Sequence, residues 1–217
     1  MTPAHMAHGH PSRSTRNDEN VTRWALAARG GNPEAVERFV RATHRDVWRF
    51  VAHLSSDVNI ADDLTQDTYL RALTSLPRYA GRSCARVWLL SIARRVVIDR
   101  YRSAAARPRI VNSVDWQAAA ERAQPDGLPE FDEGVALRDL LDALDDTRRE
   151  AFLLTQVLGL PYGDAAVVAG CPVGTVRSRV ARARADLTGW LNAAERDTAS
   201  PTRTSWDPSG EPRYRPR

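Results

Sequence analysis

The sequence predicts an all-α protein in which two small helical domains are joined by a flexible linker. Apolar residues recur every three or four positions through most of residues 21–104 and again through 131–194, which is the spacing of helices that bury one face. This pattern lapses over 105–130, a stretch with several turn-forming residues: Pro108, Pro125, Gly127 and Pro129. No part of the sequence shows the alternation of polar and apolar residues that marks a half-buried strand.

Three long helices are expected in the first domain. The first begins at Asn32-Pro33-Glu34, because proline costs little in the first turn of a helix, and its apolar residues continue to Leu54. The second covers about 59–76. A short loop over 77–82 follows, and Ser83 is the expected N-cap of the third helix.

The second domain is expected to end in a helix-turn-helix. Thr147 and Glu150 form the pattern of a capping box that opens one helix, after an apolar helix that precedes it. Two further helices, over 162–169 and 172–191, are separated by Gly170-Cys171, and glycine permits the left-handed turn between them. The two ends of the chain, 1–20 and 195–217, are poor in large apolar residues and are expected to be disordered tails.

Composition narrows the class of protein. All 31 basic side chains are arginine, and the net charge of +4 suits a nucleic-acid partner without requiring one. Two cysteines far apart predict no disulfide and no zinc site, and favour a reducing cytoplasm. No apolar run approaches the about 18 residues that a membrane span needs, and the N-terminal segment lacks the hydrophobic stretch of a secretory signal. We therefore expect a cytoplasmic protein without a membrane contact.

The sequence carries no pattern typical of an enzyme. It has no phosphate-binding glycine loop, zinc-ligand spacing, nucleophile elbow or pair of catalytic carboxylates. The histidines of the N-terminal tail, His5, His8 and His10, have no carboxylate or cysteine beside them, so no metal site is expected there. The chain is therefore predicted to be a non-enzyme that uses no cofactor and no metal.

The last helix has the pattern of a DNA-reading helix. Its apolar residues fall on one face at spacings of four, three and four: Val176, Val180, Ala183 and Leu187. The opposite face and its flanks carry the candidate DNA contacts, which are Thr175, Arg177, Ser178, Arg179, Arg182 and Arg184. Arginine bonds guanine edges or phosphates in a major groove. We expect Arg177, Ser178 and Arg182 to contact bases, and Arg179 and Arg184 to contact phosphates. The alternative is a solvated basic face.

An acidic stripe is predicted on the second helix. Its members are Asp62, Asp63, Gln66, Asp67 and Leu70, at helical spacing. Such a stripe pairs with a basic partner helix. The alternative is a solvated face whose acids are favoured by the positive end of the helix dipole.

A basic block follows this stripe. From Arg82 to Arg109 there are eight arginines and one aspartate, a local charge of +7. The candidates for contact with single-stranded DNA are Arg78, Tyr79 and Arg82 in the loop and Arg94 and Arg95 on the helix. We expect Tyr79 to stack on an extruded base. Trp88, at helical spacing with apolar neighbours, is expected in the core.

These segments resemble the extracytoplasmic-function (ECF) subfamily of sigma-70 factors. Residues 160–184 resemble region 4.2, which recognises the −35 promoter element, although Pro161 stands where many members have serine. Residues 61–73 resemble region 2.2, which docks on the β′ clamp helices of RNA polymerase, and 78–102 resemble regions 2.3 and 2.4, which melt and read the −10 element. Together with 46–51, the motifs look most similar to the actinobacterial sigma-C subgroup.

The resemblance implies a promoter-directing function without a catalytic residue of its own. Its implied partners are core RNA polymerase, through the β′ clamp helices and the β flap, together with promoter DNA and an anti-sigma factor. The competing interpretation is a stand-alone helix-turn-helix regulator that binds duplex DNA without polymerase. That interpretation leaves the acidic stripe and the basic block unexplained.

The distribution of acids suggests one further hypothesis. Residues 115–150 hold eleven acids and four arginines, a local charge of −7, between the two basic segments. This stretch either disfavours DNA binding by the free protein until polymerase separates the domains, or serves only as a solubilising linker and helix face.

Overall fold

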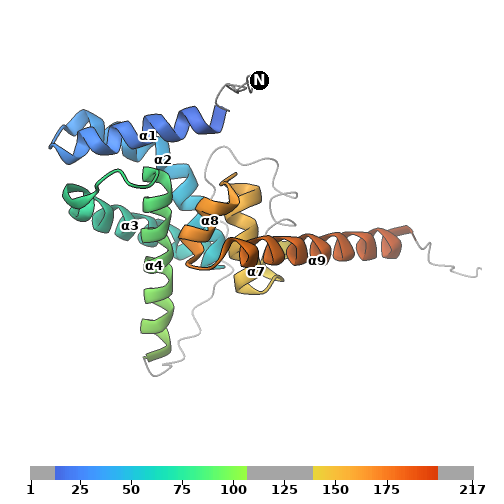
Figure 1. The fold of residues 1–217 in the computed structure, drawn as a ribbon. Helices are drawn as coiled ribbons and strands as arrows, with labels where there is room; N and C mark the ends of the chain where they lie inside the picture. Colours follow the sequence, from blue (N-terminus) through green and yellow to red (C-terminus); the bar gives the residue numbers. More distant parts are fainter. Residues whose placement is uncertain (1–12, 107–138, 200–217) are drawn as a thin grey trace, which may run out of the picture.

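The computed structural model describes residues 13–106 and 139–199, and every regular element in these ranges is helical (Figure 1). The all-α prediction is therefore confirmed. The first lobe, 13–106, contains α1 (Arg13–Arg29), α2 (Pro33–Leu54), α3 (Ala61–Ser75) and α4 (Ala85–Ala106), with short 3-10 turns at Val58–Ile60 and Leu76–Arg78. The second lobe, 139–199, contains α7 (Asp146–Phe152), a π-helical turn at Leu153–Val157, α8 (Tyr162–Ala169) and α9 (Val173–Ala199).

Side chains satisfy backbone N–H groups at the starts of α2, α4 and α7, but two of these caps differ from those expected. Helix α2 begins at Pro33, as predicted, and Asn32 caps it, since its side chain accepts a hydrogen bond from the backbone N–H of Ala35 at 3.1 Å. The prediction that Ser83 caps α4 was wrong: the N–H of Ala85 donates instead to Thr22 Oγ1 at 3.1 Å, across from α1. This hydrogen bond joins α1 to α4, and no local sequence pattern predicts it.

The capping box predicted for α7 was also wrong. Asp145 is the N-cap, because its Oδ1 accepts from the N–H of Thr147 at 3.0 Å. Asp145 stands two positions before Thr147, which lies within the helix. Aspartate is as good a cap as threonine, and this cap leaves the side chain of Glu150 free for another contact.

Both predicted tails, 1–20 and 195–217, include residues that the structure places in helices. Helix α1 starts at Arg13, inside the segment 1–20. Its buried face of Val21, Ala25 and Ala28 packs on α2, and this packing stabilises the helix. Helix α9 continues to Ala199, past the predicted boundary at residue 195, and its outer half runs away from the body of the molecule (Figure 1). The remaining tail residues and the linker from 107 onward lie outside the described residues.

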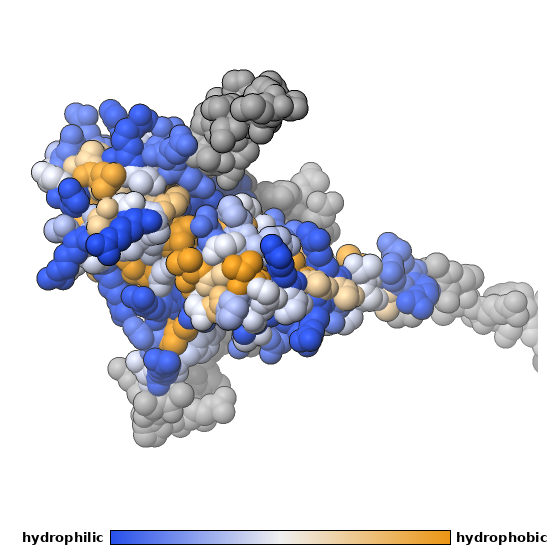
Figure 2. All heavy atoms as spheres, in the orientation of Figure 1, coloured by the Kyte–Doolittle hydropathy of each residue, from blue (hydrophilic) through white to orange (hydrophobic). Residues whose placement is uncertain are grey.

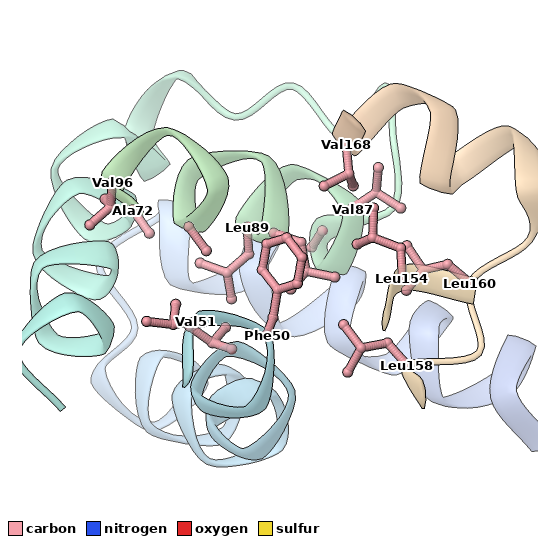
Figure 3. Close-up of a cluster of buried hydrophobic side chains, with 14 of the residues drawn as sticks. Phe50, Val51, Ala72, Val87, Leu89, Val96, Leu154, Leu158, Leu160 and Val168 are labelled. Atoms are coloured by element: carbon pink, nitrogen blue, oxygen red, sulfur yellow. The ribbon is translucent and has the colours of Figure 1, made fainter. Parts of the chain in front are cut away.

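One hydrophobic core runs through both lobes. It joins Phe39, Phe50, Leu89 and Leu90 of the first lobe to Leu154, Leu158, Leu160 and Val168 of the second. In Figure 3, Val87 of α4 lies beside Val168 and Leu154, where α4 packs against α8. A smaller cluster joins Leu141 and Leu144, before α7, and Leu153, after it, to Ala183 of α9. The lobes are therefore packed on each other as one body, which the predicted linker did not suggest.

The surface of this body is uneven in polarity. Figure 2 shows hydrophilic residues over most of the part formed by α1 and α2, and a concentration of hydrophobic residues near the middle of the view, where α8 lies. None of the helices in the described ranges has the length and apolar character needed to cross a bilayer. Within the same ranges, no three His, Cys, Asp or Glu side chains are grouped so as to hold a metal ion.

Candidate nucleic-acid and partner interfaces

The helix-turn-helix is held rigidly by its turn and its buried face. Gly170 adopts the left-handed conformation at φ +63°, which a side chain would strain. After it, the carbonyl of Pro172 accepts a hydrogen bond from the N–H of Thr175 at 2.9 Å, so that α9 begins at once. Val176, Val180 and Ala183 are buried against the other helices. The opposite face of α9 is thereby fixed towards solvent.

The exposed face of α9 carries most of the predicted DNA contacts. Arg177, Ser178 and Arg182 are exposed and flank the small side chain of Ala181, so this face has no bulky group to block a major groove. The guanidinium carbon of Arg177 lies 6.0 Å from the centre of the Tyr162 ring, which orients it from α8.

The flanking residues of α9 are held by the protein itself. Arg184 is exposed and donates a hydrogen bond to Gln156 Oε1. Arg179 is half-buried, with Nη1 3.5 Å from Cys171 Sγ. Thr175 is half-buried, and its carbonyl accepts a hydrogen bond from Ser178 Oγ at 2.9 Å. The structure thus leaves Arg177 and Arg182 as the freest guanidinium groups of the predicted set on α9.

The acidic stripe on α3 is exposed and partly pre-organised. Asp63 and Leu70, its most polar and least polar kinds of side chain, are both exposed to solvent, and Leu70 is 60% exposed. Trp48 Nε1 donates to Asp62 Oδ1 at 2.8 Å. Asp67 is held by Arg71 at 3.0 Å. Sequence analysis had not assigned these supporting contacts from α2 and from within α3.

Gln66 completes the stripe, and α4 supports it from behind. Gln66 is exposed between the acids. Arg71 also binds Asp99 of α4 at 2.7 Å, and this hydrogen bond is the main reason that the pKa of the Arg71 guanidinium is raised. The stripe therefore combines one exposed apolar side chain, Leu70, with two acids whose side chains are held by Trp48 and Arg71.

The stacking role predicted for Tyr79 was wrong in this structure. Tyr79 is only 4% exposed, its ring lies 4.8 Å from that of Trp88, and its hydroxyl donates to the carbonyl of Ser83 at 2.5 Å. Burial raises the pKa of this phenol. The 3-10 turn places Tyr79 three residues after the buried Leu76, and this spacing is the sequence signal that indicates an inward side chain.

The arginines of the basic block divide between solvent and the second lobe. Arg78, Arg82 and Arg95 are exposed, which leaves them accessible for the predicted contact with DNA. Arg94 instead reaches across the lobe boundary to Glu150, with Nε bonded to Oε1 and Nη2 3.3 Å from Oε2. Burial raises the pKa of Glu150, an effect that Arg94 partly offsets. Of the acids in 115–150 that the structure describes, Glu150 is the one ion-paired to this block.

A buried arginine that sequence analysis missed joins the lobes. Arg86 is 7% exposed, and its Nη2 donates to the carbonyl of Leu158 in the second lobe at 2.6 Å. Its Nε binds Asp46 at 2.7 Å, and Asp18 lies 3.7 Å from Nη1. Burial raises the pKa of Asp18. The signal was present, since Arg86 precedes the buried residues Leu89, Leu90 and Ala93 by three, four and seven positions.

Comparison with known proteins assigns both lobes. Residues 39–107 match the family Sigma-70 region 2, and residues 134–187 match Sigma-70, region 4. Among solved structures, CnrH in complex with the cytosolic domain of CnrY is similar with a TM-score of 0.62 and 26% identity, covering 80% of this chain and 98% of that one. The sigma factor RpoE from Bartonella quintana, in complex with the anti-sigma factor NepR, has a TM-score of 0.60 and 27% identity, covering 72% and 96%. The fold and both surfaces therefore define a sigma factor of the sigma-70 class.

Curated relatives narrow the subfamily. The probable RNA polymerase sigma-C factor of Mycobacterium bovis and the ECF RNA polymerase sigma factor SigC of Mycobacterium tuberculosis are each 51% identical over 175 residues, covering 77% of this chain and 89% of theirs. The ECF sigma factor EcfG of Rhodopseudomonas palustris is 37% identical over 142 residues, covering 65% and 77%. The chain belongs to the ECF RNA polymerase sigma factors, and the predicted resemblance to sigma-C is confirmed.

Proposed function

We propose that this ECF sigma factor binds core RNA polymerase through the stripe on α3 and directs initiation at promoters that α4 and α9 read. The observation that carries the proposal is the pair of separate exposed faces. One face, around Leu70, is an apolar centre with fixed acids, and the other, around Arg177 and Arg182, is basic with a flat middle. A protein that needed only duplex DNA would have no use for the first.

In this proposal the residues on α9 read the −35 element. Arg177 and Arg182 bond guanine edges, Ser178 bonds a neighbouring base, and Arg184 holds a phosphate. In the −10 region, Arg78, Arg82 and Arg95 hold the DNA backbone. Polymerase performs the chemistry, so the factor needs no catalytic group, and it acts in the cytoplasm, where polymerase and promoters are.

The packed lobes suggest how the free protein is restrained. Arg94, a candidate for DNA contact, is occupied by Glu150 as long as the lobes stay together. Binding of the stripe to polymerase then favours a state in which the lobes part and Arg94 is released. An anti-sigma factor, the kind of protein bound to RpoE in the relative described above, would act by holding the factor away from polymerase.

The decisive experiment is run-off transcription with purified core polymerase, with and without this protein. Initiation at defined promoters that depends on the protein is the expected result. Tight binding to duplex DNA with no effect on core polymerase would instead establish a stand-alone regulator. The promoters obtained in this way provide the DNA for the next measurement.

Replacement of Arg177 by alanine tests the reading of bases. If Arg177 bonds a guanine, R177A loses about 1–3 kcal/mol of discrimination at one promoter position and little elsewhere. The matched control is R196A, on the outer part of the same helix, where Arg196 donates to the backbone carbonyl of Asn192 at 2.9 Å. An equal loss across all sequences would assign Arg177 to a phosphate.

A further inference from the structure

Helix α2 has an exposed basic face that the proposed function does not use. Four arginines, Arg38, Arg41, Arg45 and Arg49, follow one another at spacings of three, four and four, which places them along one side of the helix. The first three are exposed and the fourth is half-buried. A shallow hollow lies along this side, lined by Glu37, Val40, Arg41, His44 and Arg45.

The first two arginines of this face are neutralised within the helix. Arg38 pairs with Glu34, one turn earlier, at 3.6 Å, and Arg41 pairs with Glu37 in the same way. Such glutamate-to-arginine pairs at i, i+4 stabilise a helix by a few tenths of a kcal/mol. This end of the face therefore carries little excess charge.

The second two arginines lack this compensation. One turn before Arg45 stands Arg41, and one turn before Arg49 stands Arg45, so that like charges follow one another. The nearest acid along the helix, Asp46, is bound to Arg86. Neither Arg45 nor Arg49 has a carboxylate within ion-pair distance in the described ranges. Burial and the charge of Arg45 together lower the pKa of Arg49.

This arrangement is unfavourable in the free protein, because like charges at i, i+4 destabilise a helix. A bound polyanion removes the penalty. Arginine is suited to the task, since its planar fork bonds two oxygens of a phosphate at once and remains charged whatever its surroundings. A hollow beside Arg45 gives an anion room to approach.

We propose that Arg45 and Arg49 bind the phosphate backbone of promoter DNA, as a further contact outside the −10 and −35 surfaces. The inference rests on the proposed function, which brings DNA to this molecule. It adds a sequence-independent contact that contributes affinity and not discrimination, because phosphates carry no base identity.

The test measures how DNA binding by the full chain depends on salt. A labelled promoter duplex and one of its single strands are titrated at several salt concentrations with the wild type and with R45Q/R49Q. The slope of log K against log salt is negative, and each lost phosphate contact reduces its magnitude by about 0.9 on duplex and about 0.7 on a single strand. In the double variant the magnitude of the duplex slope is expected to fall by about 1.8. The loss of affinity between 50 and 200 mM salt then becomes about tenfold smaller.

The matched control is E34Q/R38Q, which removes a neutral pair from the same face and leaves the slope unchanged. Thermal unfolding verifies that both variants fold. An unchanged slope in R45Q/R49Q overturns the inference, and a solvated face is then the explanation. A loss of affinity for core polymerase with an unchanged slope also overturns it, and identifies an acidic protein surface as the partner.

The two proposals can fail separately. If the slope falls as expected but run-off transcription shows no promoter-specific initiation, the phosphate contact stands and the sigma-factor function of these surfaces does not. If transcription depends on the protein while R45Q/R49Q behaves as the wild type, the sigma-factor function stands alone. Comparison of the duplex and single-strand slopes shows which form of DNA the arginines meet.

Discussion

Substitution of Val87 by alanine should loosen the second lobe, although Val87 belongs to the first. Val87 is 3% exposed on α4 and lies beside Val168 and Leu154 of the second lobe (Figure 3). Removing its two outer methyl groups costs about 1–3 kcal/mol, from lost burial and the cavity left behind. Because the lobes share one core, this loss falls on the equilibrium that separates them.

Hydrogen exchange of the backbone amides measures this coupling directly. If α8 opens through separation of the lobes, its amides exchange about 5- to 150-fold faster in V87A, since each 1.4 kcal/mol is a factor of ten. The matched control is V96A. Val96 lies on the same helix with 1% exposure, but in Figure 3 it stands beside Ala72 of α3. V96A should speed the exchange of the amides of α3 and leave the exchange of the amides of α8 nearly unchanged.

The opposite pattern would refute this reasoning. If α8 keeps its full protection in V87A while α4 alone loses it, the contact between the lobes contributes no stability, and the shared core is only an adjacency. Equal acceleration in V87A and V96A would show that the whole chain unfolds together. Opening by V87A should also raise promoter binding in the absence of polymerase, because Arg94 is released from Glu150.

Two further predictions concern the second lobe. Gly170 has φ +63° and open space where a side chain would stand, so G170A should cost about 1–2 kcal/mol from backbone strain alone, measured by urea unfolding; no loss would show that the turn relaxes. Glu150 has a pKa raised above its ordinary value of 4.5. The native state therefore keeps a proton that the unfolded state has lost, and wild-type stability should fall relative to E150Q as the pH rises from about 4.5 through the raised pKa. A stability difference that stays constant with pH would contradict the raised pKa.

Local patterns in the sequence were sufficient for the helices and for the outward faces. The stripe from Asp62 to Leu70 and the face of Arg177 and Arg182 follow from helical spacing alone, because a helix that buries one side must expose the other. The left-handed turn at Gly170 was equally readable, since glycine is the residue that such a turn favours. For these features the helical period and the residue type at the turn were sufficient, and the structure shows the faces exposed and the turn left-handed.

Two of the failures share a cause. Tyr79 and Ser83 each have a plausible local role, but in the structure Trp88 covers Tyr79, and Thr22 of α1 replaces Ser83. The capping box failed for a local reason, since Asp145 caps α7, and Glu150 pairs with Arg94 instead. A basic block in the sequence gives no sign of which arginines are buried, whereas packing buries Arg86 and pairs Arg94 with Glu150. Such choices depend on contacts between residues far apart along the chain.

The sequence by itself determined the class of this protein, because the motifs of an ECF sigma factor lie on single helices whose exposed faces are set by local periodicity. Only the tertiary structure decided how the two lobes meet. The bond from Arg86 to the carbonyl of Leu158 joins residues 72 positions apart, and the core continues through both lobes around it. Burying that charge requires partners from α2 and from the second lobe at once, and no spacing along the chain records such a meeting.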